Sequence, residues 1–176
     1  MTATTRKIVF AIFVALRVFV MSRAAEAEII DRVLAVVAGQ LITLSDVTAA
    51  RDLGLQTAEG ATDPVREILS KLIDRELIVA EVDRYAPPEP SAEAIDREAG
   101  RIRMRFPTAE AFVAILERSG TDEKQLREIV RQDLRIRAYL DQRFASAQER
   151  RQALMDDWLS GLRRRGDVVD LYLSAR

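Results

Sequence analysis

The chain of 176 residues contains no cysteine and no histidine, and only 6% of its residues are aromatic. Without cysteine it forms no disulfide and no thiolate zinc site, and it has no thiol nucleophile. Without histidine it lacks the commonest metal ligand and the usual general base near neutral pH. With 27 Lys and Arg against 28 Asp and Glu, it has no cationic field for nucleic acid. The sequence therefore predicts no cofactor, no metal and no nucleic-acid partner.

The first 27 residues have the order of regions found in an export signal. Two basic residues near the start precede an apolar run over residues 8–21, and residues 25–27 (Ala-Glu-Ala) form the small-x-small pattern that a signal peptidase cleaves. The run is short for a membrane span and is interrupted by Arg17. We therefore predict cleavage after Ala27, a periplasmic mature chain of residues 28–176 and no stable membrane insertion. An uncleaved leader that anchors the chain in the inner membrane is the alternative.

The mature chain is predicted to be mainly α-helical, with one small β-sheet. Residues 30–43 are rich in β-branched side chains on both sides of a turn at Gly39, which is typical of a β-hairpin. Residues 168–173 alternate between two faces, as a strand does. Because a lone strand needs a partner, we expect the C-terminal strand to join the N-terminal hairpin in one sheet on a helical body.

Capping and stop signals divide the intervening sequence into helices. The predicted helices run from Ser45 to about Leu53, from Asp63 with Pro64 to about Tyr85, from Ser91 to Phe106, from Thr108 to Arg118, from Thr121 to about Phe144, and over residues 149–165. Gly166 is predicted to end the last helix in the left-handed conformation.

Three stretches of the mature chain carry a resemblance to a known family. Residues 31–47 (DRVLAVVAGQLITLSDV) are similar to the opening of the SurA-type periplasmic chaperones, in which a hairpin of the form V-x-x-V-V-x-x-x-x-I-T-x-S-D-V leads into the first helix. The similarity continues through residues 72–78 (LIDRELI) and 126–134 (LREIVRQDL). The resemblance implies a helical core like the SurA N-terminal domain. In this core, residues 28–144 form one module, and a C-terminal helix and strand over residues 149–176 complete it.

The chain departs from the family's pattern at one point. Relatives commonly carry parvulin-type prolyl isomerase domains between these two parts, whereas only residues 145–148 separate them here. Four residues hold no domain, and the chain has no histidine, so we expect no isomerase activity. The prediction is a chaperone core and not an enzyme.

Charged residues on otherwise apolar helix faces form one candidate site. Helical periodicity places Glu76 on such a face of one predicted helix, and Asp133 with Arg137 on such a face of another. Two carboxylates brought together can perform acid–base chemistry. We favour a structural interpretation, in which Asp133 pairs with Arg137 and Glu76 pairs with a different arginine. Trp158, on the apolar stripe of the last helix, is also predicted to be structural.

A peptide-binding surface is the second candidate site. Methionine and aromatic side chains suit promiscuous binding because they repack around varied partners. The sequence offers Met104, Phe106, Phe112 and Tyr139 for this role. The alternative for each is ordinary core packing or, for Met104, a single exposed apolar side chain.

The sequence and the resemblance together predict an ATP-independent periplasmic chaperone for unfolded exported polypeptides, including those of the outer membrane. Client apolar side chains would be buried reversibly in a helical crevice. Two other functions remain open: an assembly subunit that docks one fixed envelope partner, and, by family association, a prolyl isomerase. A crevice lined by apolar side chains favours the chaperone, and a large flat apolar patch favours the assembly subunit.

Overall fold

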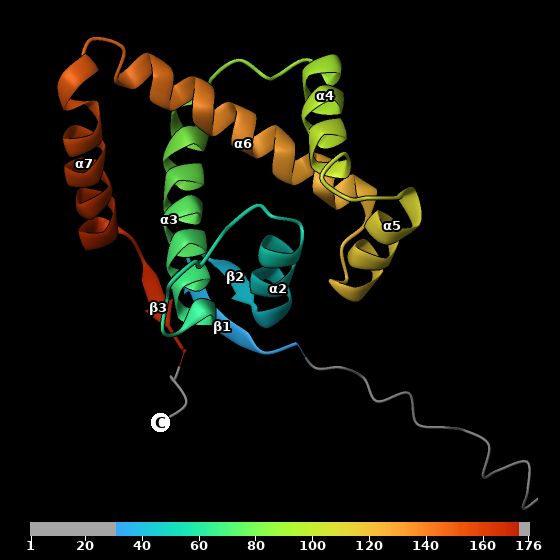
Figure 1. The fold of residues 1–176 in the computed structure, drawn as a ribbon. Coiled ribbons are helices and arrows are strands. Elements are labelled where there is room, and N and C mark those ends of the chain that lie inside the picture. Colours follow the sequence, from blue (N-terminus) through green and yellow to red (C-terminus); the bar gives the residue numbers. More distant parts are fainter. Residues whose placement is uncertain (1–30, 173–176) are drawn as a thin grey trace, which may run out of the picture. The chain divides into compact units, whose positions relative to one another are not determined.

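The computed structural model describes residues 31–172. The predicted signal peptide and its cleavage after Ala27 lie outside the described residues. In chain order (Figure 1) the elements are β1 (Val33–Val37), β2 (Gln40–Thr43), α2 (Leu44–Asp52), α3 (Pro64–Tyr85), α4 (Ala92–Arg103), α5 (Ala109–Arg118), α6 (Glu123–Arg143), a 3-10 turn (Gln148–Arg150), α7 (Arg151–Arg165) and β3 (Val168–Asp170). The predicted fold class, mainly helical with a small sheet, is confirmed. Within residues 31–172 no helix has both the length and the apolar character that a membrane crossing requires.

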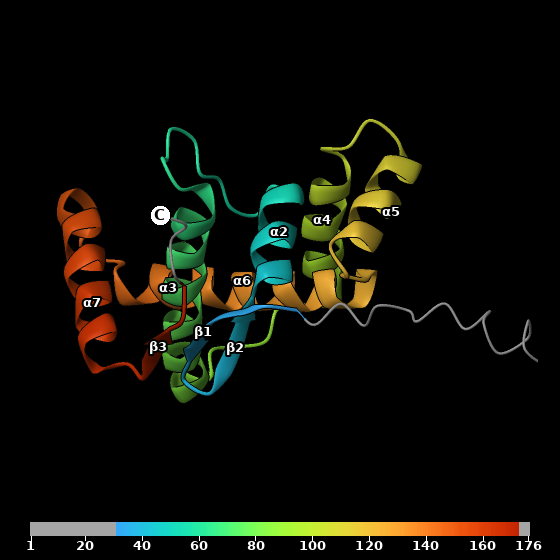
Figure 2. The ribbon, with the colours of Figure 1, turned by 90° about the horizontal axis from the view of Figure 1, so that it is seen from below.

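The sheet joins the two ends of the described chain. Its strands are antiparallel in the order β2-β1-β3, which Figure 2 shows side by side. Ala38 and Gly39 connect β1 to β2, and both have positive φ (49° and 83°). A two-residue hairpin loop favours this geometry because its twist matches that of the strands. The prediction that the C-terminal strand pairs with the N-terminal hairpin is therefore confirmed.

Two helix caps differ from the predicted ones. Helix α2 is capped by Thr43 and not by Ser45, because the Thr43 hydroxyl accepts from the Asp46 N–H while the Asp46 carboxylate accepts from the Thr43 N–H. Helix α6 is capped in the same reciprocal way by Asp122 with Gln125, and not by Thr121. Each reciprocal pair satisfies two backbone donors at once. The other predicted caps are confirmed, namely Asp63, Ser91 and Thr108.

Two apolar clusters form the core. The first joins the sheet, α2, α3 and α7 through buried residues that include Leu34, Val37, Ile42, Ile68, Leu69, Leu77 and Leu162. The second joins the end of α2 to α4, α5 and α6 through Ala49, Leu53, Ile102, Phe112, Leu116, Leu126 and Val130. Helix α2 contributes to both clusters and so connects them.

Gly166 ends α7, but not in the predicted left-handed conformation. Its φ of −72° and ψ of 146° are extended, and its N–H donates to the Leu162 carbonyl. A Cβ at this position would overlap Leu77 Cδ2 and lie 2.9 Å from the Leu162 oxygen. The glycine is therefore explained by the close approach of the chain to α3, and not by backbone dihedral freedom.

Candidate functional site: a groove between the sheet edge and helix α6

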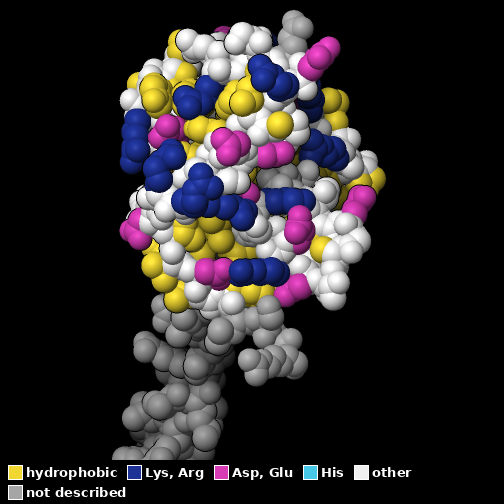
Figure 3. All heavy atoms as spheres, turned by 90° about the vertical axis from the view of Figure 1, so that its left-hand side faces the viewer, with side chains coloured by type: hydrophobic (Ala, Val, Ile, Leu, Met, Phe, Trp, Pro, Cys, Tyr) yellow, Lys and Arg dark blue, Asp and Glu magenta, His cyan; other side chains and the backbone are white. Residues whose placement is uncertain are grey.

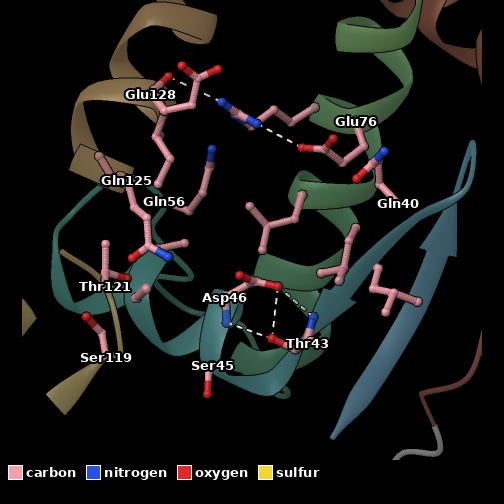
Figure 4. Close-up of a pocket in the computed structure, with 18 of the residues that line it drawn as sticks. Gln40, Thr43, Ser45, Asp46, Gln56, Glu76, Ser119, Thr121, Gln125 and Glu128 are labelled. Carbon is pink, nitrogen blue, oxygen red and sulfur yellow. Dashed lines mark hydrogen bonds and ion pairs between the residues drawn. The ribbon is translucent and has the colours of Figure 1, made fainter. Parts of the chain in front are cut away.

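A groove of about 720 Å³ lies where β2, α2, α3 and α6 surround a common space, with the loop before α6 at one end. Figure 4 shows its walls: Gln40 and Glu76 on one side, Gln56, Gln125 and Glu128 on the other, and Thr43 and Asp46 below. The lining therefore brings together three parts of the chain that are far apart in the sequence, namely the continuous β2–α2 segment, α3 and α6.

The groove has an apolar floor. Ile42, Ala49 and Ala50 are buried there, and Leu55, Leu72 and Ile129 are half-buried beside them. Leu41, on the edge strand β2, also lines the groove and keeps 60% of its surface exposed. Small and aliphatic side chains of this kind offer apolar area without directional demands on what covers them.

Arg75 connects the two long helices that face each other across the groove. Its Nε donates to Asp133 Oδ1 at 2.9 Å, and its Nη1 donates to Glu76 Oε1 at 2.8 Å. Its Nη2 donates to Gln132 Oε1 at 3.0 Å and to the Ile129 carbonyl at 3.3 Å. Because the Arg75 side chain is only 15% exposed, these charge-assisted bonds are poorly screened and fix the helix spacing.

The predicted pairing of these charges is half right. Glu76 does pair with another arginine, Arg75. Asp133, however, pairs with Arg75 across the groove and not with Arg137. Arg137 is exposed and makes no ion pair within the described part of the chain. The partner of Asp133 is set by the crossing of α3 and α6, which local spacing within α6 does not encode.

The remaining carboxylates on the rim are also held by the chain. Arg131 donates two hydrogen bonds to Glu128 and lowers the pKa of that carboxyl, against the opposing effect of burial. Burial raises the pKa of Asp31, but hydrogen bonds from Thr43 and Ser45 outweigh it and hold the pKa below its usual range. The carboxyls of Glu128 and Asp31 are therefore charged at neutral pH. Among residues 31–172 no set of three or more acidic side chains is arranged to hold a metal ion.

The four residues predicted to bind peptide are dispersed. Phe112 and Tyr139 are core residues, 2% and 6% exposed. Phe106 packs on Phe112 with ring centroids 5.5 Å apart, whereas Met104, after α4, is 76% exposed. None of the four is among the described residues that line the groove. The structure therefore brings Phe106 and Phe112 together and places Tyr139 elsewhere.

Tyr139 belongs to an aromatic group at the junction of α6 and α7. Its ring centroid lies 6.1 Å from that of Trp158, and Trp158 lies 5.8 Å from Phe144 in an edge-on arrangement. The Arg143 guanidinium lies 5.3 Å from the centroid of Trp158. Trp158 also packs against the first apolar cluster, so it occupies the structural position expected for it.

The sequence signal that singled out Glu76 and Asp133, charge on an apolar helix face, also marks the groove. This signal missed Arg75. The residue is next to Glu76 in α3, but the sequence does not place it on an apolar face. The signal also missed the groove's glutamines, Gln40, Gln56, Gln125 and Gln132. Exposed glutamines are common on helices and loops, so only the fold shows that these four face one space.

Comparison of the sequence with models of protein families gives no match, and comparison with curated proteins gives none either. The resemblance to the SurA-type chaperones therefore depends on the three motifs and remains a prediction.

Proposed function

We propose that this protein is a periplasmic, ATP-independent chaperone-like protein that binds unfolded exported polypeptides, including outer-membrane ones, through apolar contacts. The observation that carries the proposal is the groove, with its apolar floor and its rim of amides and carboxylates. The export signal predicted for residues 1–27 and the three motifs support the periplasmic setting.

The chemistry of the groove suits an extended, unfolded segment. The floor buries apolar side chains of the client. The amides of Gln40 and Gln56 on the rim can both donate and accept hydrogen bonds, as a peptide backbone requires. Neither contact selects a particular sequence. Ordering a disordered client offsets much of the gain, so we expect dissociation constants of about micromolar. Binding of this kind needs no nucleotide.

The test is suppression of the aggregation of an unfolded outer-membrane β-barrel protein by the mature chain, without ATP. Leu72→Asn and Ile129→Asn each place a polar group on the groove floor, and both should reduce suppression several-fold. Val113→Asn is the matched control, because Val113 is an exposed apolar residue of α5 that does not line the groove.

Two results would overturn the proposal. One is no suppression by the wild-type chain at a several-fold molar excess over the client. The other is suppression that Leu72→Asn and Ile129→Asn leave unchanged while Met104→Asn abolishes it, which would place the surface at the end of α4.

A second candidate, an assembly subunit that docks one folded partner, is favoured by a different observation. Leu41 on β2, Val169 on β3 and Leu171 just after β3 are 60%, 49% and 48% exposed. Such a subunit would bind one folded envelope protein tightly and would not suppress aggregation.

A further inference from the structure

Within residues 31–172, one edge of strand β2 has no strand partner. The pairing of β1 identifies which residue of β2 presents its backbone groups at this edge. Leu171 N–H donates to the Leu34 carbonyl at 2.9 Å, and Ala38 N–H donates to the Asp167 carbonyl at 2.9 Å. Hydrogen-bonded pairs recur at every second residue of an antiparallel ladder. Val36, midway between Leu34 and Ala38 and paired with Val169, therefore directs its N–H and C=O toward β3.

The consequence for β2 follows directly. Val36 is also the partner of Leu41. Since the backbone groups of Val36 face β3, the pair with Leu41 is of the non-hydrogen-bonded type, and the Leu41 N–H and C=O point away from β1. Leu41 lines the groove. The neighbouring Thr43 N–H is taken by Asp46 at 2.8 Å, so Leu41 is where the edge of β2 offers a donor and an acceptor together.

The net charge of the groove is negative. Five carboxylates are among its described lining residues, those of Asp31, Asp46, Glu76, Glu128 and Asp133. Arg75 is the one cation among the same lining residues, and its guanidinium already donates to four acceptors of this chain. Arg131, beside the groove, offsets Glu128. The groove therefore attracts cationic side chains and repels carboxylates.

From these observations we infer that the groove takes its client as an extended strand added to the edge of β2 at Leu41, and that it prefers segments in which apolar residues alternate with lysine or arginine. Alternation fits because successive side chains of a strand point to opposite faces. One face then meets the apolar floor and the other meets the carboxylates of the rim. The inference rests on the proposed function, since it specifies which unfolded segments the same groove binds.

The charge preference is tested with three labelled peptides that share their apolar positions and alternate them with Lys, Gln or Glu. Fluorescence anisotropy with the mature protein measures each dissociation constant. At low salt we expect the Lys peptide to bind roughly tenfold more tightly than the Glu peptide, equivalent to about 1.4 kcal/mol. The difference should shrink at about 0.5 M salt, where charges are screened over a few ångströms. Equal affinities for the three peptides at low salt would overturn the charge preference.

Strand addition is tested by removing one backbone donor at a time. Leu41→Pro deletes the outward N–H and keeps the ladder to β1 intact, because proline is tolerated where an edge-strand N–H faces outward. It should weaken Lys-peptide binding at least several-fold more than Leu41→Ala, which keeps the N–H. A Lys peptide with N-methylated backbone amides gives the same test without altering the protein, so a Leu41→Pro chain that fails to fold does not block the test. Unchanged binding of the N-methylated peptide would overturn strand addition.

Failure of the inference and failure of the proposed function give different results. If no peptide binds and aggregation is not suppressed, the proposed function is wrong. If the peptides bind without regard to charge or to backbone methylation while aggregation is suppressed, the groove holds clients by apolar contact alone and the inference is wrong.

Discussion

Helix α3 contacts two other helices by different chemistry. Against α7 it presents Ile73 and Leu77, which pack with Leu162 in the first apolar cluster, and Gly166 lets the chain approach closely. Against α6, which crosses it in Figure 1, the contact is made mainly by Arg75 and by Arg135, which donates to Asp83 at 2.7 Å. Tyr85 also packs on Tyr139 at one end of this contact, with ring centroids 5.4 Å apart. The first contact is apolar at its centre, with the Arg163–Asp74 ion pair at its exposed side, whereas the second holds the helices apart beside an open groove. Apolar packing closes a surface, and long ionic side chains leave room for a ligand.

The two sides also differ in charge. Seen from the side of α7 in Figure 3, arginine and lysine side chains are interspersed with acidic ones, and hydrophobic areas lie between them. Three arginines and one acidic residue line a shallow hollow there beside Trp158, namely Arg143, Arg164, Arg165 and Asp157. The groove on the α6 side is lined instead by carboxylates. The hollow beside Trp158 and the groove therefore differ in the sign of their net charge, although the net charge of the whole chain is near zero.

The largest expected effect is on the apolar contact. Trp158→Ala removes a ring that packs on Tyr139, Phe144 and the first cluster, and it should lower the free energy of unfolding by about 3 kcal/mol. Leu154→Ala, at an exposed position of the same helix, should change it by about 0.5 kcal/mol or less. Urea unfolding measures both. If Trp158→Ala lowers the free energy of unfolding as little as Leu154→Ala does, α7 is an appendage whose packing does not stabilise the fold.

The next largest effect comes from removing one arginine at each contact, Arg75 at the contact with α6 and Arg163 at the contact with α7. Arg75→Met removes bonds to two carboxylates at a mostly buried position and should cost about 2 kcal/mol. Arg163→Met removes the bidentate contact with Asp74, at 2.5 and 2.7 Å, but the Arg163 side chain is half exposed. It should cost less than about 1 kcal/mol. If the two losses are reversed, charge stabilises the α7 contact and not the α6 contact.

A pair of glycines tests the close approach of α7 to α3. Gly166→Ala would force Leu77 to move and should destabilise the protein by about 1–3 kcal/mol. Gly100→Ala in α4 meets no atom within 4 Å and should stabilise it by about 0.5–1 kcal/mol, because alanine favours a helix. Thermal melting gives the signs. A stabilising Gly166→Ala would show that the chain does not approach Leu77 so closely.

The smallest expected effect is a pH dependence of stability that comes from the Asp63 carboxyl, which binds Tyr172 after the C-terminal strand. The Arg66 N–H and the Tyr172 hydroxyl donate to Asp63, and these bonds lower the pKa of its carboxyl, with the Arg66 backbone bond the largest cause. A depressed pKa stabilises the fold above the ordinary value near 4, and this stability is lost as pH falls through the folded value. Asp63→Asn, which still caps α3, should therefore be less stable than wild type at pH 7, with the gap narrowing below about pH 4. A gap independent of pH in urea titrations would contradict this account.

The parts of the fold that local sequence determines could be predicted. The hairpin turn, Asp63 with Pro64, and the strand after Gly166 each carry their signal within a few residues, and the structure has the corresponding elements. The predictions were wrong where two neighbouring residues could both cap a helix, or where a contact with a distant element decides the conformation. Thr43 caps α2 in place of Ser45 because Thr43 and Asp46 form reciprocal hydrogen bonds.

The candidate site could be predicted only in part. Charge on apolar faces identified Glu76 and Asp133, but their common partner Arg75 depends on how α3 and α6 cross. Two of the aromatic residues predicted to form a binding surface, Phe112 and Tyr139, are buried in the core. Composition identifies side chains that suit binding, but it does not say which ones packing leaves exposed.

The most direct test of the central claim is photo-crosslinking to an unfolded client. A photoreactive side chain at Gln40 or Gln56 lies in the lining of the groove, and one at Gln152 lies on the exposed surface of α7. With an unfolded outer-membrane β-barrel protein as client, crosslinks from Gln40 and Gln56 should exceed those from Gln152 several-fold, and excess unlabelled client should compete them away. Crosslinks of equal yield from all three positions, or a larger yield from Gln152, would contradict a binding site in the groove.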